Sequence, residues 1–294
     1  MADITFEGRV AIITGAGGGL GRQHALLLAA RGAQVVVNDL GGAVDGQGSS
    51  AGPAQTVVDE IAKAGGLAVA DTNSVASAQG AAATVQTALD AFGRVDIVIN
   101  NAGILRDKSF ANMTDEFWDP VLAVHLTGAA QVTWAAWPHL QAQGYGRIVN
   151  TSSAAGIFGN FGQANYGAAK MGLVGLTRVL AQEGKKHDIA VNAIAPVART
   201  RMTDELLGPL ADKVDPALVS PVVAWLAHED CPVSGEIFSV CGGRVAQVFV
   251  GETAGFFKKD LDVEDVRDHF DEIRSRDGYF VPTSARSELK VIVP

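Results

Sequence analysis

The chain has 294 residues, of which 48% are hydrophobic and 19% are charged. This length suits one large domain or two small ones, and the apolar fraction suffices for a sizeable buried core, which argues against disorder. The formal net charge of −9 disfavours nucleic acid or an anionic membrane surface as the main partner, because both are negatively charged.

Cysteine usage and the chain ends bear on the cellular compartment. Two cysteines, Cys231 and Cys241, are too few for a disulfide framework in a chain of this size. The sequence has no apolar run of the roughly 18 residues that a membrane span needs, and no signal segment opens it. The last four residues, Val291 to Pro294, do not form a peroxisomal Ser-Lys-Leu address. We therefore expect a protein of the cytoplasm with reduced cysteines and no membrane span.

Short β-branched runs alternate along the chain with longer segments rich in alanine and leucine. The predicted strands are residues 9–14, 34–38, 67–70, 95–100, 147–151, 190–194 and 237–240, and the predicted helices are 20–30, 54–64, 78–92, 115–141 and 164–186. The strands are apolar almost throughout, which is typical of a parallel sheet covered on both faces. With right-handed crossovers, this pattern predicts an α/β fold with a doubly wound parallel sheet of seven strands.

The composition changes after Gly243. Residues 244–294 are richer in charge and contain one amphipathic stretch, 262–276. Because roughly 50 residues bury too little surface to fold alone, we expect one domain over residues 1–243. Residues 244–294 would then be a C-terminal extension that packs on the cleft or on a dimer interface.

A glycine-rich turn follows the first predicted strand and opens the first predicted helix. It reads Thr-Gly-Ala-Gly-Gly-Gly-Leu-Gly over residues 14–21. Gly15, Gly19 and Gly21 allow a tight turn, the close approach of a pyrophosphate and the packing of the helix on the strand. With Leu20, these residues form a candidate dinucleotide site, typical of a Rossmann-type fold. The alternative is a plain strand-to-helix turn.

An acidic residue, Asp39, lies 18 residues after Gly21 and directly follows the second predicted strand, close to the spacing of about 20 in dinucleotide sites. Its carboxylate would accept hydrogen bonds from the adenosine ribose hydroxyls and repel a 2′-phosphate. Positions 18 and 38 carry no basic side chain, so NAD is favoured over NADP. The alternative is a helix cap or a solvated turn residue. The loop 41–52 either covers the adenosine end or is a floppy surface insertion.

Tyr166 and Lys170 are four residues apart in a predicted helix, so both side chains lie on one face. A phenol with a pKa of about 10 is a poor base at neutral pH. A nearby ammonium and an oxidised nicotinamide both favour phenolate, so we expect the pKa of Tyr166 to fall. Ser153 ends the fifth strand and could hold the substrate oxygen. The pair alone could be two solvent-facing residues, but with Ser153 and Asp39 it indicates an active site.

The chain resembles the short-chain dehydrogenase/reductase family from about residue 6 to residue 243. The resemblance rests on the glycine turn, on Asn100-Asn101-Ala102-Gly103 and on the Ser153, Tyr166 and Lys170 trio. It implies that Tyr166 donates and accepts the proton, that Ser153 orients the substrate, and that Lys170 binds the nicotinamide ribose and lowers the pKa of Tyr166. It also implies that Asn100, Ala102 and Gly103 belong to the cofactor cleft.

Three segments, 38–42, 101–107 and 159–166, resemble one group within this family, the dehydrogenase part of type 2 peroxisomal multifunctional enzymes. That resemblance implies NAD-dependent oxidation of a (3R)-hydroxyacyl-CoA or a steroid-CoA thioester, as in fatty-acid β-oxidation. The hydratase and sterol-carrier regions of those enzymes are absent, so we expect a free-standing counterpart. The alternatives are an NADPH-linked 3-oxoacyl reductase, a 17-beta-hydroxysteroid dehydrogenase or a catalytically silent NAD-binding scaffold.

The chain departs from the family pattern near the catalytic trio and at the adenine end. His125 stands where many members carry a catalytic asparagine, and it is either part of the site or a buried helix histidine. Asn73, followed by Ser74, stands where an adenine-contacting aspartate is usual. The Asn73 carbonyl can still accept a hydrogen bond from the adenine amino group, so both residues remain cofactor candidates.

A third departure follows the sixth predicted strand, where Pro196-Val197 replaces the family's Pro-Gly. We expect residues 196–203 to lie near the nicotinamide carboxamide, with either Thr200 or Thr203 in contact with it. Residues 157–163, a lid over 196–210 and the C-terminal tail would shape the substrate cleft.

The remaining expectations concern metals and oligomers. The six histidines show no metal-ligand spacing, so we predict no metal site. The long helices after strands four and five resemble the dimer-forming pair of the family, which predicts a homodimer or homotetramer. The expected partner is a small-molecule substrate of the acyl-CoA or steroid type.

Overall fold

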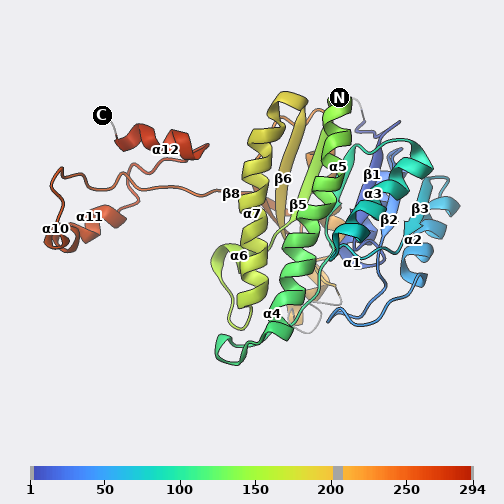
Figure 1. Cartoon of the computed structure of the whole chain (residues 1–294), viewed down its shortest axis with the longest axis horizontal. Helices are drawn as coiled ribbons and strands as arrows, with labels where there is room; N and C mark the ends of the chain where they lie inside the picture. The colour runs from blue at the N-terminus through green and yellow to red at the C-terminus, as the bar shows by residue number, and fades with distance from the viewer. Residues whose placement is uncertain (1–2, 201–207, 293–294) are drawn as a thin grey trace. The chain divides into compact units, whose positions relative to one another are not determined.

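The computed structural model describes residues 3–200 and 208–292 (Figure 1). The chain divides into two compact units, one reaching to Gln247 and one beginning at Val248. How the second unit packs, on the cleft or on a dimer interface, stays a prediction.

The first unit is built on one sheet, with strand order β3-β2-β1-β4-β5-β6-β7-β8 in the described residues. The strands are β1 Val10–Thr14, β2 Gln34–Asn38, β3 Leu67–Asp71, β4 Ile97–Asn100, β5 Gly146–Thr151, β6 Ile189–Val197, β7 Ile237–Cys241 and β8 Arg244–Val248. Strands β1 to β7 pair in parallel. The predicted α/β doubly wound sheet is therefore confirmed. Strand β8 exceeds the predicted count of seven and uses residues that the sequence assigned to the extension.

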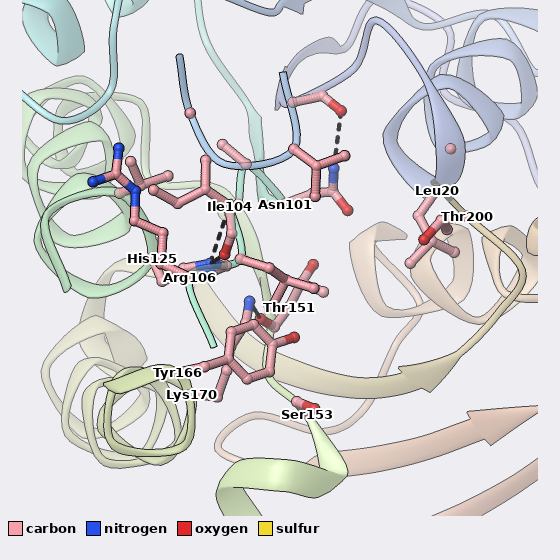
Figure 2. Close-up of a pocket in the computed structure, with 18 of the residues that line it drawn as sticks. Leu20, Asn101, Ile104, Arg106, His125, Thr151, Ser153, Tyr166, Lys170 and Thr200 are labelled. Atoms are coloured by element: carbon pink, nitrogen blue, oxygen red, sulfur yellow. Dashed lines mark hydrogen bonds between the residues drawn. The ribbon is translucent and has the colours of Figure 1, made fainter. Parts of the chain in front are cut away.

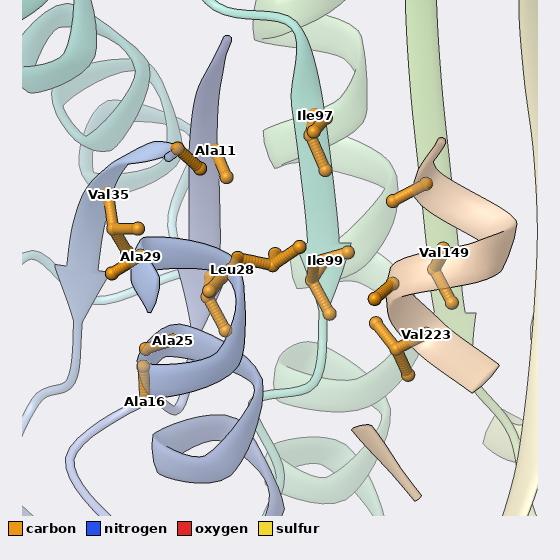
Figure 3. Packing of buried hydrophobic residues seen from close by; sticks show 14 of the residues in the cluster. Ala11, Ala16, Ala25, Leu28, Ala29, Val35, Ile97, Ile99, Val149 and Val223 are labelled. Atoms are coloured by element: carbon orange, nitrogen blue, oxygen red, sulfur yellow. The ribbon is translucent and has the colours of Figure 1, made fainter. Parts of the chain in front are cut away.

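The helices of the first unit lie on both faces of the sheet (Figure 1). They are α1 Gly19–Ala30, α2 Gly52–Lys63, α3 Ala78–Phe92, α4 Asp115–Leu122, α5 Ala129–Gln143, α6 Ala154–Phe158, α7 Ala164–Gly184 and α9 Ser220–Ala227. Short 3₁₀ turns cover 110–112, 185–187, 208–213 and 216–218. Residues of α1, α2 and α9 share one buried apolar cluster with the sheet (Figure 3), and α3, α5 and α7 share another on the opposite face. Burial on both faces explains why the strands are apolar throughout.

The strand order reverses between β1 and β4, because the chain leaves β1 toward β2 and β3 and returns to the other side. In open α/β sheets, ligands bind outside the carboxyl ends of the strands at such a switch point. The glycine turn follows β1 and the Asn-Asn-Ala-Gly segment follows β4, so the topology brings both motifs to this point.

The predicted helix over 115–141 is divided in the structure. Between α4 and α5, residues Ala123–Gly128 form a wide π turn. Such turns add one residue per turn and occur frequently at functional sites. A Cβ at Gly128 would lie 3.0 Å from the Val75 carbonyl oxygen, so glycine lets this turn approach the loop after β3. Periodicity cannot distinguish such a turn from continuous α-helix.

The second unit contains three short helices, α10 Val263–Asp268, α11 Phe270–Arg274 and α12 Ala285–Ile292. The predicted amphipathic stretch corresponds to α10 and α11. Asp262 caps α10 reciprocally with Asp265. In the described residues of both units, no helix combines the length and apolar character that crossing a membrane requires.

Candidate active site

A cleft of about 820 Å³ opens at the carboxyl ends of the strands (Figure 2). Most of the residues predicted for the site line it: Gly15, Gly19, Leu20, Asp39, Asn73, Ser74, Ala102, Gly103, His125, Ser153, Tyr166, Lys170, Pro196 and Thr200. Two predicted residues, Gly21 and Asn100, do not. The fold therefore gathers motifs that lie more than 150 residues apart in the sequence into one concave site.

The glycine turn packs so closely against neighbouring backbone that side chains at two of its positions would collide with it. Gly15 has a positive φ of 65°, and a Cβ there would lie 2.7 Å from the Ala102 Cα. At Gly21 a Cβ would lie 2.3 Å from the Gly15 carbonyl oxygen. Gly21 thus lies beneath the turn and lets α1 approach β1, the packing role that its spacing predicted.

Two residues that sequence reasoning missed lock this turn onto the loop after β4. The Thr14 Oγ1 accepts hydrogen bonds from the backbone N–H groups of Asn101 and Ala102, both at 3.0 Å. The Asn101 Nδ2 donates in return to the carbonyl oxygens of Thr14 and Gly15, at 3.0 and 3.1 Å. The sequence does show a polar residue at the end of each of these two strands. Only the folded structure shows that the two residues lie close enough to bond.

Asp39 is fixed at the mouth of the glycine turn. One carboxylate oxygen accepts the Gly17 N–H at 2.7 Å and the other accepts the Gly41 N–H at 2.7 Å. A Cβ at Gly17 would lie 2.8 Å from the Asp39 Cγ, so this glycine makes room for the carboxylate. Each carboxylate oxygen keeps acceptor capacity for a ligand hydroxyl. The hydrogen bond to Gly17 joins Asp39 to the glycine turn, which a plain solvated turn residue would not do, and the role of Asp39 toward a ribose stays a prediction.

The loop 41–52 is tied to the neighbouring segment. The Leu105 N–H donates to the Val44 carbonyl oxygen at 2.9 Å. The Arg106 guanidinium donates to the carbonyl oxygens of Asp45 and Glu116, at 2.8 and 2.7 Å. Residues of this loop line the cleft, so it forms a wall of the site rather than a floppy insertion.

The expectation that Asn100 lines the cofactor cleft is wrong, because Asn100 lies behind the cleft wall and is not part of its lining. Its side chain is buried and donates to the Thr133 Oγ1 and the Asn150 Oδ1, both at 2.9 Å. The reason is strand alternation: the side chain at the end of β4 points to the helix face, where groups of α5 and β5 accept hydrogen bonds from its amide nitrogen. The next residues, Asn101 to Gly103, line the cleft instead.

Ser153, Tyr166 and Lys170 lie together at one end of the cleft, away from Leu20 and Thr200 (Figure 2). Ser153 caps α6, where its hydroxyl accepts the Ala155 N–H at 3.2 Å. Lys170 is 3% exposed, its Nζ donates to the Thr151 carbonyl oxygen, and the same Nζ lies 5.5 Å from the Tyr166 ring centroid.

Burial dominates the electrostatics of this trio. It lowers the pKa of Lys170 from 10.5 to about 7. Burial also raises the pKa of Tyr166 above its usual 10; the hydrogen bond with Ser153 lowers it, and the charge of Asp107 raises it further. The expectation that the pKa of Tyr166 falls is therefore wrong where the protein's own groups alone act on it. Desolvation of the phenolate raises this pKa more than the Ser153 hydrogen bond lowers it.

His125 lies in the π turn and packs edge-on against Tyr166, with ring centroids 5.1 Å apart. Its Nε2 lies 3.0 Å from the Ile104 nitrogen and 2.7 Å from the Ile104 carbonyl oxygen. Burial and the charge of Lys170 hold the pKa of His125 well below 6.5, so the imidazole is neutral. A Cβ at Gly103 would lie 2.3 Å from the His125 ring. His125 is thus a buried helix histidine that also touches the candidate catalytic tyrosine.

The far end of the cleft contains the loop after β3. Asn73 and Ser74 both line it, and the Ser74 hydroxyl accepts the Ala76 N–H at 3.3 Å. The Asn73 side chain donates to the carboxylate of Asp71, the last residue of β3. Sequence reasoning missed Asp71, although a charged residue ending an apolar strand was a visible signal.

The segment after β6 approaches the glycine turn. Pro196 lies within β6, and a Cβ at Gly19 would lie 3.4 Å from the Thr200 side chain. Thr200 therefore lies beside the start of α1. Thr203, with the part of the predicted lid over 201–207, is outside the described residues.

A glycine turn with an acidic partner and a serine, tyrosine and lysine trio in one cleft defines a dinucleotide-binding oxidoreductase. Residues 9–208 match the family model of short chain dehydrogenases. The chain belongs to this short-chain dehydrogenase family, as the sequence predicted.

Among curated relatives, the chain is 50% identical to the mouse peroxisomal multifunctional enzyme type 2, over 92% of this chain and 37% of that enzyme. It is 41% identical to the hydroxyacyl-CoA dehydrogenase ChsB1 of Mycobacterium tuberculosis, over 82% of this chain and 80% of that enzyme. The chain thus spans about a third of the mouse enzyme.

Two solved structures are also similar. The full-length peroxisomal multifunctional enzyme type 2 of Drosophila melanogaster has a TM-score of 0.82 and 37% identity, over 98% of this chain and 49% of that one. A 7α-hydroxysteroid dehydrogenase complexed with NADH has a TM-score of 0.75 and 29% identity, over 83% of this chain and 98% of that one. The predicted resemblance to type 2 multifunctional enzymes is thereby confirmed.

Proposed function

We propose that this protein is an NAD-dependent dehydrogenase that oxidises a secondary hydroxyl to a ketone on a (3R)-hydroxyacyl-CoA or steroid-CoA thioester. The observation that carries the proposal is one cleft lined both by Asp39 with the glycine turn and by Ser153, Tyr166 and Lys170. The relative named as a hydroxyacyl-CoA dehydrogenase supports the substrate class, and the neighbour that binds NADH supports a nicotinamide cofactor.

The residues present fit NAD. Gly15, Gly18 and Gly19 line the cleft at the start of α1, and the first backbone N–H groups of a helix suit a pyrophosphate. The Asp39 carboxylate would accept the hydroxyls of the adenosine ribose, and its charge opposes a 2′-phosphate. Lys170 would hold the nicotinamide ribose. When bound, NAD supplies the hydride acceptor.

Tyr166 is the proposed general base. Ser153 would hold the substrate hydroxyl by a hydrogen bond while the Tyr166 phenolate takes its proton. Since burial works against the phenolate, the positive charges nearby must stabilise it: Lys170 below its pKa of about 7, and an oxidised nicotinamide. The Thr151 carbonyl oxygen, which accepts from the Lys170 Nζ, fixes the ammonium in the cleft wall.

The test is NADH formation from a medium-chain (3R)-hydroxyacyl-CoA, beside its (3S) isomer and a 17-beta-hydroxysteroid, with NADP as the second cofactor. Turnover of the (3R) thioester with NAD alone supports the proposal. Reaction of only the steroid overturns the substrate class. Preference for NADPH and a 3-oxoacyl substrate favours the reductase, and NAD binding without turnover favours the silent scaffold.

The assembly and the location are proposals as well. We propose a homodimer or homotetramer in which α5 and α7 meet a second copy. These helices contact each other, and each exposes a large apolar side chain: Trp134 is 78% exposed and Val179 is 55% exposed. A monomer by light scattering would refute this. The cytoplasmic location rests on the sequence alone, and fractionation of the source cells would test it.

A further inference from the structure

A buried carboxylate stands directly behind the far end of the cleft. Asp71, the last residue of β3, is 4% exposed. Its Oδ2 accepts hydrogen bonds from the Asn38 Nδ2 at 2.6 Å and the Thr84 Oγ1 at 2.8 Å. Its Oδ1 accepts from the Asn73 Nδ2 and from the Thr87 Oγ1 at 3.1 Å. Among the described residues Asp71 has no salt bridge, so neutral donors alone compensate its desolvation.

This carboxylate fixes the orientation of the Asn73 amide. The two ends of an amide have nearly the same shape but opposite hydrogen-bonding character. A carboxylate only accepts, so the NH₂ end of Asn73 must face Asp71 and the Oδ1 end must face away from it. No hydrogen bond to this Oδ1 is found in the part of the chain that the structure describes, and Asn73 lines the cleft. The wall therefore presents an acceptor here.

The same network holds this acceptor in place relative to Asp39. The Asn38 Nδ2, which bonds to Asp71, also donates to the Asn73 carbonyl oxygen at 2.9 Å. The Asp39 N–H donates to the Asp71 carbonyl oxygen at 2.9 Å. Asp71 thus connects the end of β2 and Asp39 directly after it, the residue proposed for the adenosine ribose, to the loop that carries the acceptor.

We propose that Asp71 is a positioning residue that sets the base selectivity of the dinucleotide site. By holding the Asn73 amide in one orientation, it presents Oδ1 to the 6-amino group of a purine. A 6-oxo purine would place an acceptor against this acceptor and lose the hydrogen bond. The inference rests on the proposed function, because it assigns the base recognised by that same site.

The test compares the affinities of NADH and reduced nicotinamide hypoxanthine dinucleotide, measured by calorimetry. The wild type should prefer the adenine form by about tenfold, the effect of one net hydrogen bond. In Asp71→Asn the side chain at position 71 offers both a donor and an acceptor, so the Asn73 amide can flip and exchange the positions of its oxygen and nitrogen. We expect that variant to lose affinity for NADH alone, which brings the ratio close to one. Asn73→Ala, which lacks the acceptor, should give the same ratio.

Two further variants separate positioning from stability. Thr87→Val removes a different donor from Asp71 and should keep the wild-type ratio. The exchange Asp71→Asn with Asn73→Asp restores an acceptor toward the base and a donor behind it, so it should restore the adenine preference. The exchange also carries the test if Asp71→Asn fails to fold, and an exchange variant without preference overturns the inference.

The remaining outcomes are distinct. Equal weakening of both dinucleotides in Asp71→Asn, or an unchanged ratio, overturns the inference while the proposed function stands. A wild type that binds neither dinucleotide overturns the proposed function itself, and the inference with it.

Discussion

The imidazole of His125 packs edge-on against the phenol ring of Tyr166, with an angle of 88° between the ring planes. A neutral ring at this place cannot supply a positive charge to the phenolate, because burial and Lys170 keep the pKa of His125 well below 6.5. His125 therefore supports Tyr166 by ring packing, and its own ring is held by the hydrogen bond between its Nε2 and the Ile104 backbone.

His125→Ala should lower both stability and turnover. The substitution leaves a buried Ile104 backbone group without its partner, which costs about 1–3 kcal/mol, and it opens space beside Tyr166. The phenol then loses its fixed position, and we expect kcat to fall by about tenfold or more. Thermal melting and steady-state kinetics measure the two effects.

His24 offers a matched control for that variant. It is also a buried helix histidine, and its Nδ1 bonds to the Ser220 hydroxyl at 2.8 Å, but it does not line the cleft. His24→Ala should therefore lose stability while keeping kcat. Equal loss of kcat in both variants would show that His125 acts only through stability.

Residues whose position follows from their own place in the chain could be placed from sequence. The strands are apolar and of regular spacing, and Gly15, Asp39 and Tyr166 belong to motifs within a few residues of strand or helix ends, which brings them to the cleft. For this reason the prediction of the fold was correct, and nearly all of the predicted site residues line one cleft.

Properties that depend on distant neighbours could not be predicted. The role proposed for Asp71 depends on hydrogen bonds with Asn38 and Thr84, which lie on other elements. Asn100 points away from the cleft, where groups of α5 and β5 accept from its amide nitrogen. The direction of the Tyr166 pKa shift was missed for the same reason. Sequence shows the nearby lysine but not the depth of burial, and burial dominates.

Tyr166→Phe should abolish turnover and keep NADH binding. The change removes the proton acceptor, and general acid–base groups contribute about 10²–10⁴-fold to rate, so kcat should fall by at least about a hundredfold. Tyr145→Phe is the control, since Tyr145 is a buried tyrosine that does not line the cleft. Stopped-flow rates with calorimetric NADH binding make the comparison, and full activity of Tyr166→Phe would refute the assigned base.

The lowered pKa of Lys170 predicts how the free energy of unfolding changes with pH. Its pKa is about 7 in the folded protein against 10.5 as a model value, so between these pH values the unfolded chain binds more protons. The free energy of unfolding should therefore rise from pH 7 toward pH 10. The penalty for the buried ammonium is complete below pH 7 and is several kcal/mol, at most about 5. Above pH 10, the raised pKa of Tyr166 works in the opposite direction.

Urea unfolding at several pH values, for the wild type and Lys170→Met, isolates this contribution. The variant lacks the titrating group, so the wild type should gain stability relative to it as the pH rises from 7 to 10. A difference that stays constant over this range would show that Lys170 keeps an ordinary pKa.

Asp39→Ala should weaken the preference for NAD over NADP. The substitution removes the acceptor proposed for the ribose hydroxyls and the negative charge that opposes a 2′-phosphate. Hydrogen bonds to charged groups contribute about 1.5–3 kcal/mol, so kcat/KM with NAD should fall by about 10- to 100-fold, with a much smaller loss for NADP.

Asp45→Asn is the matched control for this change, because Asp45 lies in the adjoining loop and its carboxylate accepts from the Gln47 N–H at 3.1 Å. It does not line the cleft, so the ratio of kcat/KM values should stay at the wild-type level. Since Asp39 also bonds to Gly17 and Gly41, a general distortion of the turn would weaken both cofactors alike. Only a selective fall in kcat/KM with NAD supports the proposal that the Asp39 carboxylate distinguishes the ribose hydroxyls from a 2′-phosphate.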